Sequence, residues 1–161
     1  MTSMEIDRPD VVAEVTAAFA AYEQALVDGD PDRICGFFWD SGRTVRFGIA
    51  DHQYGLDEQH KWRAAQPPLP PGRRLVDPLV TTFGPDVAVV TTRFGYAGTA
   101  ATGRQTQTWV RLPAGWRIVT AHVSTPLPPT PPVDHEVDGS LEINDCRQPH
   151  DQRSGVGRAR R

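Results

Sequence analysis

The residues best suited to chemistry are a tyrosine and an arginine whose neighbours in the pattern are apolar. Tyr22 lies in the middle of an apolar helical stripe, where a buried phenol must find a hydrogen-bond partner. Arg46 lies between Val45 and Phe47 in a predicted strand, so its guanidinium must face water, a carboxylate or a bound anion. Together the two could bind a small anion and move a proton. A purely structural tyrosine and a solvent-facing arginine are the alternative interpretations.

A histidine in the last predicted strand is the third candidate. Its spacing places His122 on the same face as Ile118, Thr120 and Ser124. An imidazole there could titrate near neutral pH, hold a substrate oxygen or fix Ser124. A core histidine with satisfied hydrogen bonds is the alternative.

Two amides extend the set, because Gln105 and Gln107 share one face of a predicted strand with Trp109. They could line a pocket wall as neutral donors. The opposite face carries Arg104, Thr106 and Thr108. The sequence leaves open which of these two faces is concave.

Several familiar sites are absent from the sequence. No histidine or acidic cluster has metal-ligand spacing, and no glycine-rich phosphate loop or serine nucleophile motif is present. Cys35 and Cys146 are interpreted as ordinary reduced thiols. We therefore expect neither a metal nor another cofactor.

The composition is typical of one globular domain. The chain has 161 residues, of which 39% are hydrophobic and 23% charged, with a net charge of -3. This balance argues against nucleic acid and membrane surfaces as partners. Charged residues interrupt the first 25 positions too often for a signal segment, so we expect a cytoplasmic protein.

The periodicity predicts three helices followed mainly by strands. Helices are expected at about 9–28, from Pro31 to before Asp40, and at about 56–65 with Trp62 as an apolar anchor. Strands are expected at 44–48, 74–83, 87–96, 105–112 and 116–124, with a turn from Asp51 to Gly55. We expect a flexible N-terminus (1–8), a domain (9–125) and a Pro-rich, mostly disordered tail (126–161).

This order predicts an α+β fold in which helices cover one face of a curved antiparallel sheet. Short turns between the last four strands favour a meander. A pocket is expected between the sheet and the helical stripe.

Several segments resemble a known family. These segments are EVTAAFAAYEQALVDGD, FFWDSGRTVRFG, YGLDE, WRAAQ and GRQTQTWVRLPAGWRIVTAHVS. They cover about residues 10–125 and are similar to the SnoaL-like, nuclear-transport-factor-2-type fold, and within it to the AtzH and HpxZ subfamily. The resemblance implies a cone-shaped α+β domain, often a homodimer formed through the sheet.

The resemblance also implies an activity. It implies a decarboxylating amidohydrolase that removes one N-carboxylate from 1,3-dicarboxyurea to give allophanate, with Tyr22 and Arg46 as the functional pair. Phe47 stands where the family commonly has a tyrosine, which bears on substrate choice. Family members are encoded beside amidases, so an amidase is a candidate partner.

On this basis we expect Arg46 to grip one carboxylate of a small urea- or oxalurate-type diacid and Arg63 to hold a second. Tyr22 is expected to exchange a proton with the amide nitrogen or carbonyl. The expected orienting groups are Gln105, Gln107, His122 and Ser124.

Two other functions stay open. One is a non-catalytic accessory or ligand-binding partner of an amidase. The other is an isomerase or cyclase of the same fold, for which Asp40 and Asp57 are the nearest candidates for a general base.

Overall fold

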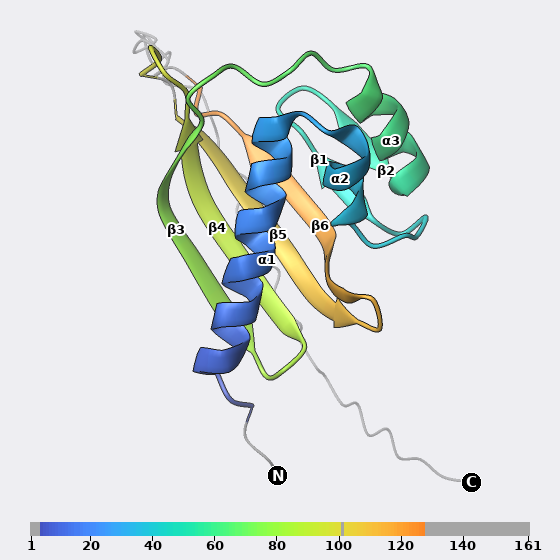
Figure 1. The fold of residues 1–161 in the computed structure, drawn as a ribbon, viewed down its shortest axis with the longest axis vertical. Coiled ribbons are helices and arrows are strands. Elements are labelled where there is room, and N and C mark those ends of the chain that lie inside the picture. Colours follow the sequence, from blue (N-terminus) through green and yellow to red (C-terminus); the bar gives the residue numbers. More distant parts are fainter. Residues whose placement is uncertain (1–3, 101, 128–161) are drawn as a thin grey trace, which may run out of the picture. The chain divides into compact units, whose positions relative to one another are not determined.

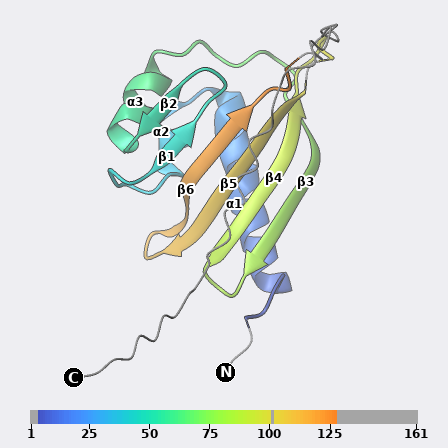
Figure 2. The same ribbon diagram turned by 180° about the vertical axis from the view of Figure 1, so that it is seen from behind.

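The structure, a computed structural model, describes residues 4–100 and 102–127. Three helices lie on one side of a six-stranded sheet, and Figure 2 shows the sheet from behind. The helices are α1 (Pro9–Asp28), α2 (Pro31–Gly36) and α3 (Leu56–Ala64). The strands are β1 (Val45–Phe47), β2 (His52–Tyr54), β3 (Arg74–Phe83), β4 (Val87–Gly95), β5 (Gly103–Leu112) and β6 (Gly115–Ser124). The α+β fold expected from the sequence is confirmed (Figure 1).

The long helix α1 follows the apolar stripe seen in the sequence. Val11, Val15 and Phe19 are buried on its sheet-facing side, so the three- and four-residue spacing does mark the core face. Pro9 begins the helix, where its missing N–H costs no helical hydrogen bond. Gly29 ends it with φ of 66°, a left-handed conformation that glycine adopts without strain.

The next helix begins where its cap predicts. The Asp30 side chain accepts a hydrogen bond from the Arg33 backbone N–H at 3.0 Å, and Pro31 occupies the first turn. The helix ends at Gly36, earlier than expected, although Phe38 is still buried in the core. The turn after α2 therefore places aromatic rings under α1 without further helix.

Removing a core ring from α1 tests how far this packing supports the fold. Phe19→Ala is expected to lower the free energy of unfolding by about 3–5 kcal/mol, because it leaves a cavity in the core. Urea denaturation followed by circular dichroism measures it. Val27→Ala on the exposed side of α1 is the control, with an expected change within about 0.5 kcal/mol. Equal losses in both variants would contradict this assignment of the core face.

The strand order is β2-β1-β6-β5-β4-β3, and the last four strands form the predicted antiparallel meander. Two features differ from the expectation. The segment expected as a turn from Asp51 to Gly55 contains β2, which pairs antiparallel with β1. Strand β1 pairs parallel with β6, so the sheet is mixed rather than antiparallel throughout. Strand β2 has only three residues, two of them polar, which is too short for an alternating pattern to be recognised in the sequence.

A β-bulge changes the direction in which β6 side chains point. Thr108 of β5 pairs with Thr120, but the next residue, Trp109, pairs with Ile118, which leaves Val119 as an extra residue. Before the bulge Ile118 faces the helices. After it Ala121 is the buried residue, because one extra residue reverses the alternation.

The N-terminal segment of the described region contacts β3. Ile6 forms a bridge with Phe83, and the Asp7 backbone N–H donates to the Thr82 carbonyl at 3.1 Å, where the sequence predicted a flexible segment. From residue 128 onward, the predicted Pro-rich tail lies outside the described residues.

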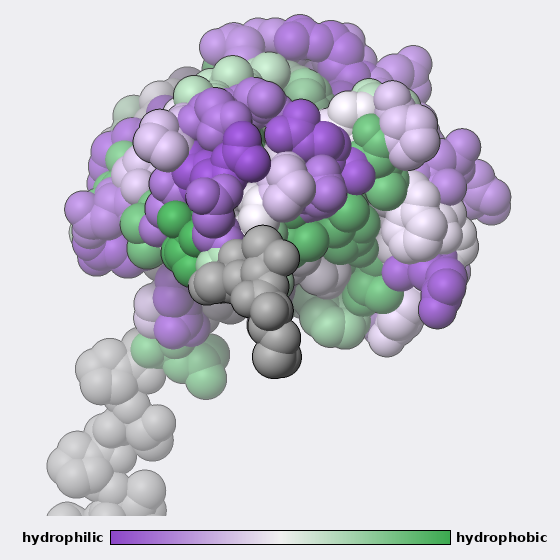
Figure 3. Space-filling model, turned by 90° about the horizontal axis from the view of Figure 1, so that it is seen from below, coloured by the Kyte–Doolittle hydropathy of each residue, from purple (hydrophilic) through white to green (hydrophobic). Residues whose placement is uncertain are grey.

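Seen from below, the surface is largely polar with apolar residues scattered between (Figure 3). Among the described helices, none is long and apolar enough to cross a membrane.

Candidate functional site

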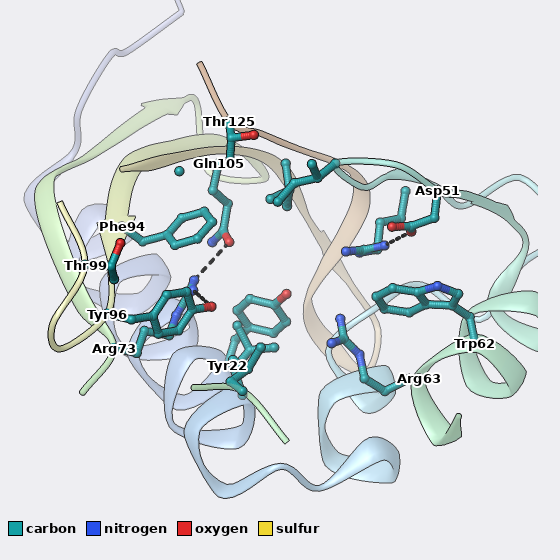
Figure 4. Close-up of a pocket in the computed structure, with 16 residues that line it drawn as sticks. Tyr22, Asp51, Trp62, Arg63, Arg73, Phe94, Tyr96, Thr99, Gln105 and Thr125 are labelled. Carbon is teal, nitrogen blue, oxygen red and sulfur yellow. Dashed lines mark hydrogen bonds and ion pairs between the residues drawn. The ribbon is translucent and has the colours of Figure 1, made fainter. Parts of the chain in front are cut away.

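A cavity of about 300 Å³ lies between the helices and the sheet, where the fold predicted a pocket. Its walls come from α1, the β1–β2 hairpin, α3, the segment before β3, and the strands β4 to β6. Figure 4 shows Tyr22 between two polar groups, with Arg73 and Gln105 on one side and Arg63 and Trp62 on the other. The cavity therefore has two chemically distinct ends, and the Tyr22 phenol lies between them.

Arg46 lies on the helix-facing side of β1 and lines the cavity, while Phe47 points to the opposite, exposed side. Its Nη1 donates to Asp51 Oδ1 at 2.7 Å and to Gln53 Oε1 at 2.8 Å. The guanidinium carbon lies 4.2 Å from the centre of the Trp62 ring. Among the described residues, its Nη2 and Nε have no hydrogen-bond partner, so donors remain for a ligand. The solvent-facing alternative does not hold.

Arg63 reaches the same end from α3. Its guanidinium carbon lies 4.7 Å from the centre of the Trp62 ring, so one indole carries two arginines. No carboxylate of the described residues pairs with Arg63. Burial lowers the pKa of Arg63, yet an arginine remains a cation at neutral pH. The cavity thus contains a guanidinium whose charge no described side chain neutralises.

Tyr22 is positioned by rings on three sides. Its ring packs edge-on against Phe37, Phe38 and Trp109, with centroids 5.8, 6.0 and 6.3 Å away. Its hydroxyl has no hydrogen-bond partner among the described residues, although the residue is only 4% exposed. Burial raises the pKa of Tyr22, and the positive charge of Arg63 opposes this shift. The phenol is therefore protonated at neutral pH and points into the cavity (Figure 4).

The other end is built around a buried ion pair. Arg73 Nε donates to Glu23 Oε2 at 2.7 Å, and its Nη2 donates to Glu23 Oε1 at 3.2 Å. Gln105 Nε2 also donates to Glu23 Oε1, at 2.9 Å, while Arg73 Nη1 donates to the Tyr96 hydroxyl at 3.1 Å. These side chains satisfy one another, so this end offers polarity without an unpaired charge.

The remaining predicted residues do not all reach the cavity. Gln105 lines it, as expected. Gln107 shares that face but is fully buried, where its Oε1 accepts from Trp109 Nε1 at 3.1 Å. His122 and Ser124 do not line it. His122 packs edge-on against the exposed Phe47, because the bulge reverses the alternation that placed it beside Ile118.

The sequence did not single out Asp51, Arg73 or Glu23, and it assigned Trp62 only to the apolar core. Trp62 stands alone between Lys61 and Arg63, and a lone aromatic among cations was an available signal for a binding role. The ion pair joins positions 50 residues apart, for which the sequence offers no signal.

The two aspartates considered as a general base also lie elsewhere. Asp57 is in the exposed first turn of α3, and Asp40 lines a separate surface hollow. Within the described residues, no group of three or more His, Cys, Asp or Glu side chains is arranged to hold a metal ion.

Asp51 gives this site a predicted pH dependence. Burial opposes its ionisation, but hydrogen bonds from Gln53 and Arg46 outweigh burial and hold the pKa of Asp51 below its usual range. The ionised carboxylate therefore stabilises the fold above the pKa of the unfolded chain, and this contribution is lost as the pH falls through the folded pKa. We expect Asp51→Asn to flatten the fall in stability from about pH 5 downward, measured by urea denaturation. Asp57→Asn is the control, and equal slopes in the two variants would contradict the prediction.

A profile of the AtzH-like family matches residues 4–127. The chain belongs to the AtzH-like family. The match includes every helix and strand of the fold and all the residues that line the cavity. No curated protein matches the sequence significantly.

Solved structures place this family member among similar folds. A cystatin-like fold protein from Burkholderia xenovorans LB400 is 48% identical, with a TM-score of 0.73 over 76% of this chain and 97% of that one. A protein with unknown function from Pectobacterium atrosepticum is 42% identical, with a TM-score of 0.74 over 78% of this chain and 100% of that one. A nuclear transport factor 2-like superfamily protein from Salmonella enterica, 22% identical with a TM-score of 0.62, shares the fold. The nuclear-transport-factor-2-type architecture expected from the sequence is confirmed.

Proposed function

We propose that this protein is a cofactor-independent decarboxylating amidohydrolase. Its substrate is a small urea- or oxalurate-type dicarboxylate such as 1,3-dicarboxyurea, from which it removes an N-carboxylate. The AtzH-like family membership supports this reaction class. The observation that carries it is the unpaired Arg63 guanidinium beside Tyr22 in a cavity of about 300 Å³, a size suited to a small anion.

In the proposed reaction the bond between a urea nitrogen and its carboxylate carbon breaks. The electron pair of that bond passes to nitrogen, which takes a proton, and the carboxylate leaves as carbon dioxide. The free donors of Arg46, on Nη2 and Nε, bind the substrate together with Arg63. Trp62 holds both guanidinium groups in place by stacking.

Tyr22 supplies the proton in this proposal. Its hydroxyl has no competing partner among the described residues and stays protonated at neutral pH, because burial raises its pKa. The positive charges of Arg63 and Arg46 stabilise the phenolate formed after the transfer. A proton from solvent then restores the phenol.

The arrangement argues against an isomerase with a free carboxylate base. Asp51 is bonded to Arg46 and Glu23 is bonded to Arg73, so both carboxylates at the cavity are held as ion pairs. A carboxylate whose oxygens already accept hydrogen bonds from a guanidinium is poorly placed to remove a proton from carbon.

The direct test is an assay of the purified chain without any partner. We expect carbon dioxide release from an N-carboxylated urea above the spontaneous rate, with oxalurate and allophanate assayed in parallel. Lack of turnover on the whole panel would reject the enzymatic proposal. Silence together with stable co-purification with an amidase would instead support an accessory role.

A further inference from the structure

The positive and negative side chains at the cavity are distributed unequally between its two ends. Among the described side chains, three arginines line the cavity; Arg46 is paired with Asp51, which also lines it, and Arg73 is paired with Glu23. Arg63 is the remaining cation. The surplus positive charge therefore belongs to the end formed by Arg63, Trp62 and Arg46.

The opposite end is closed to a second anion. The Arg73 side chain is 5% exposed and that of Glu23 is 10% exposed, and their bidentate contact is shielded from water. Arg73 also donates to the Tyr96 hydroxyl and to Gln105 Oε1. A carboxylate placed here would be desolvated beside an ion pair that is already complete, at a cost that no new charge pairing offsets.

The two arginines that were expected to hold separate carboxylates lie at one end. Both stack on the same indole, with guanidinium carbons 4.2 and 4.7 Å from its centre. Both positive charges therefore lie at the Trp62 end of the cavity, and neither is at the Arg73 end where the second carboxylate of a diacid would lie.

We propose that this charge asymmetry orients the substrate, so that the carboxylate retained in the product binds Arg63 and Arg46 while the departing N-carboxylate faces the neutral Arg73–Glu23–Gln105 end. The inference rests on the proposed function and assigns its two carboxylates. Tyr22 lies between the two ends, next to where the nitrogen of the breaking bond would be (Figure 4). Loss of carbon dioxide removes the negative charge of the departing carboxylate, which has no positive partner at this end. The nitrogen keeps the electron pair of the broken bond and takes the proton. The monoanionic product class therefore fits the cavity better than the dianionic substrate class.

Binding of two stable ligands tests this without turnover. Malonamate and malonate have nearly the same size, but malonamate has an amide where malonate has its second carboxylate. In mildly alkaline buffer we expect calorimetry to show malonamate binding about tenfold more tightly than malonate. Arg63→Gln should weaken malonamate binding by about 10- to 100-fold, whereas Arg93→Gln, an exposed arginine paired with Asp77, should not change it. Equal or tighter binding of malonate would overturn the inference.

A charge change at Glu23 tests the neutral end itself. Glu23→Gln leaves Arg73 without its carboxylate, so malonate should then bind at least as tightly as malonamate. With an N-carboxylated urea, the same variant should lower KM and kcat together, because the ground state gains a pairing that the product lacks. The double variant Glu23→Gln with Arg73→Met removes both charges and should restore the wild-type preference. If the single variant does not fold, the double variant still tests the inference, because a preference of the double variant for malonate would overturn the assignment of this end as neutral.

The outcomes separate this inference from the proposed function. A malonamate preference that depends on Arg63, without turnover of any N-carboxylated urea, supports the charge assignment and rejects the reaction. Turnover combined with a malonate preference in the wild-type chain keeps the reaction and rejects the orientation.

Discussion

Tyr22→Phe is expected to lower kcat for N-carboxylate removal by about 10²- to 10⁴-fold, the usual contribution of a positioned proton donor. The phenylalanine ring keeps the edge-on contacts with Phe37, Phe38 and Trp109. Malonamate affinity should therefore change little. Steady-state kinetics and calorimetry on the same preparation separate the two effects.

The stability of this variant is a further readout. The Tyr22 hydroxyl has no partner among the described residues, so its removal should leave the free energy of unfolding unchanged or higher. Tyr54→Phe is the matched control, because Tyr54 is 53% exposed on β2 and does not line the cavity. Full activity in Tyr22→Phe would rule out the phenol as proton donor, and equal losses in both variants would point to a general defect.

Arg46→Lys is expected to lower kcat/KM nearly as much as Arg46→Ala, by about 10²- to 10³-fold in each case. The guanidinium binds Asp51 and Gln53 through Nη1 while its Nη2 and Nε remain for the substrate. A lysine has a single nitrogen and no planar fork, so it cannot serve both sides and also stack on Trp62.

The control for this pair is Arg104→Lys, a change at an exposed arginine on the far face of β5. We expect that variant to retain wild-type kcat/KM. Undiminished turnover in Arg46→Lys would show that positive charge alone suffices and would remove the argument for a bidentate contact. A large loss in Arg46→Ala with full activity in Arg46→Lys would lead to the same conclusion.

Local patterns accounted for most of the secondary structure. The spacing of Val11, Val15 and Phe19 identified the buried face of α1, and Asp30 with Pro31 identified the start of α2. Such signals are readable because each depends on residues within a few positions of one another. The meander followed from its short turns for the same reason.

Features that depend on pairing between distant segments were missed. Strand β2 and the parallel contact of β1 with β6 join segments whose own patterns are short or ambiguous. The bulge at Val119 is a single extra residue, yet it moved His122 and Ser124 away from the cavity. Alternation counted along the chain is reliable only until the register changes.

The sequence by itself determined the α+β architecture and singled out Tyr22, Arg46 and Gln105. Tyr22 is a polar residue in an apolar helical stripe, Arg46 interrupts an apolar strand, and Gln105 shares a strand face with Trp109. Only the tertiary structure decided which charges are neutralised. Glu23 meets Arg73 across 50 residues, and Asp51 meets Arg46 through a hairpin that the pattern did not predict. A charge's availability to a ligand depends on its neighbours in space, and these come together only when the chain folds.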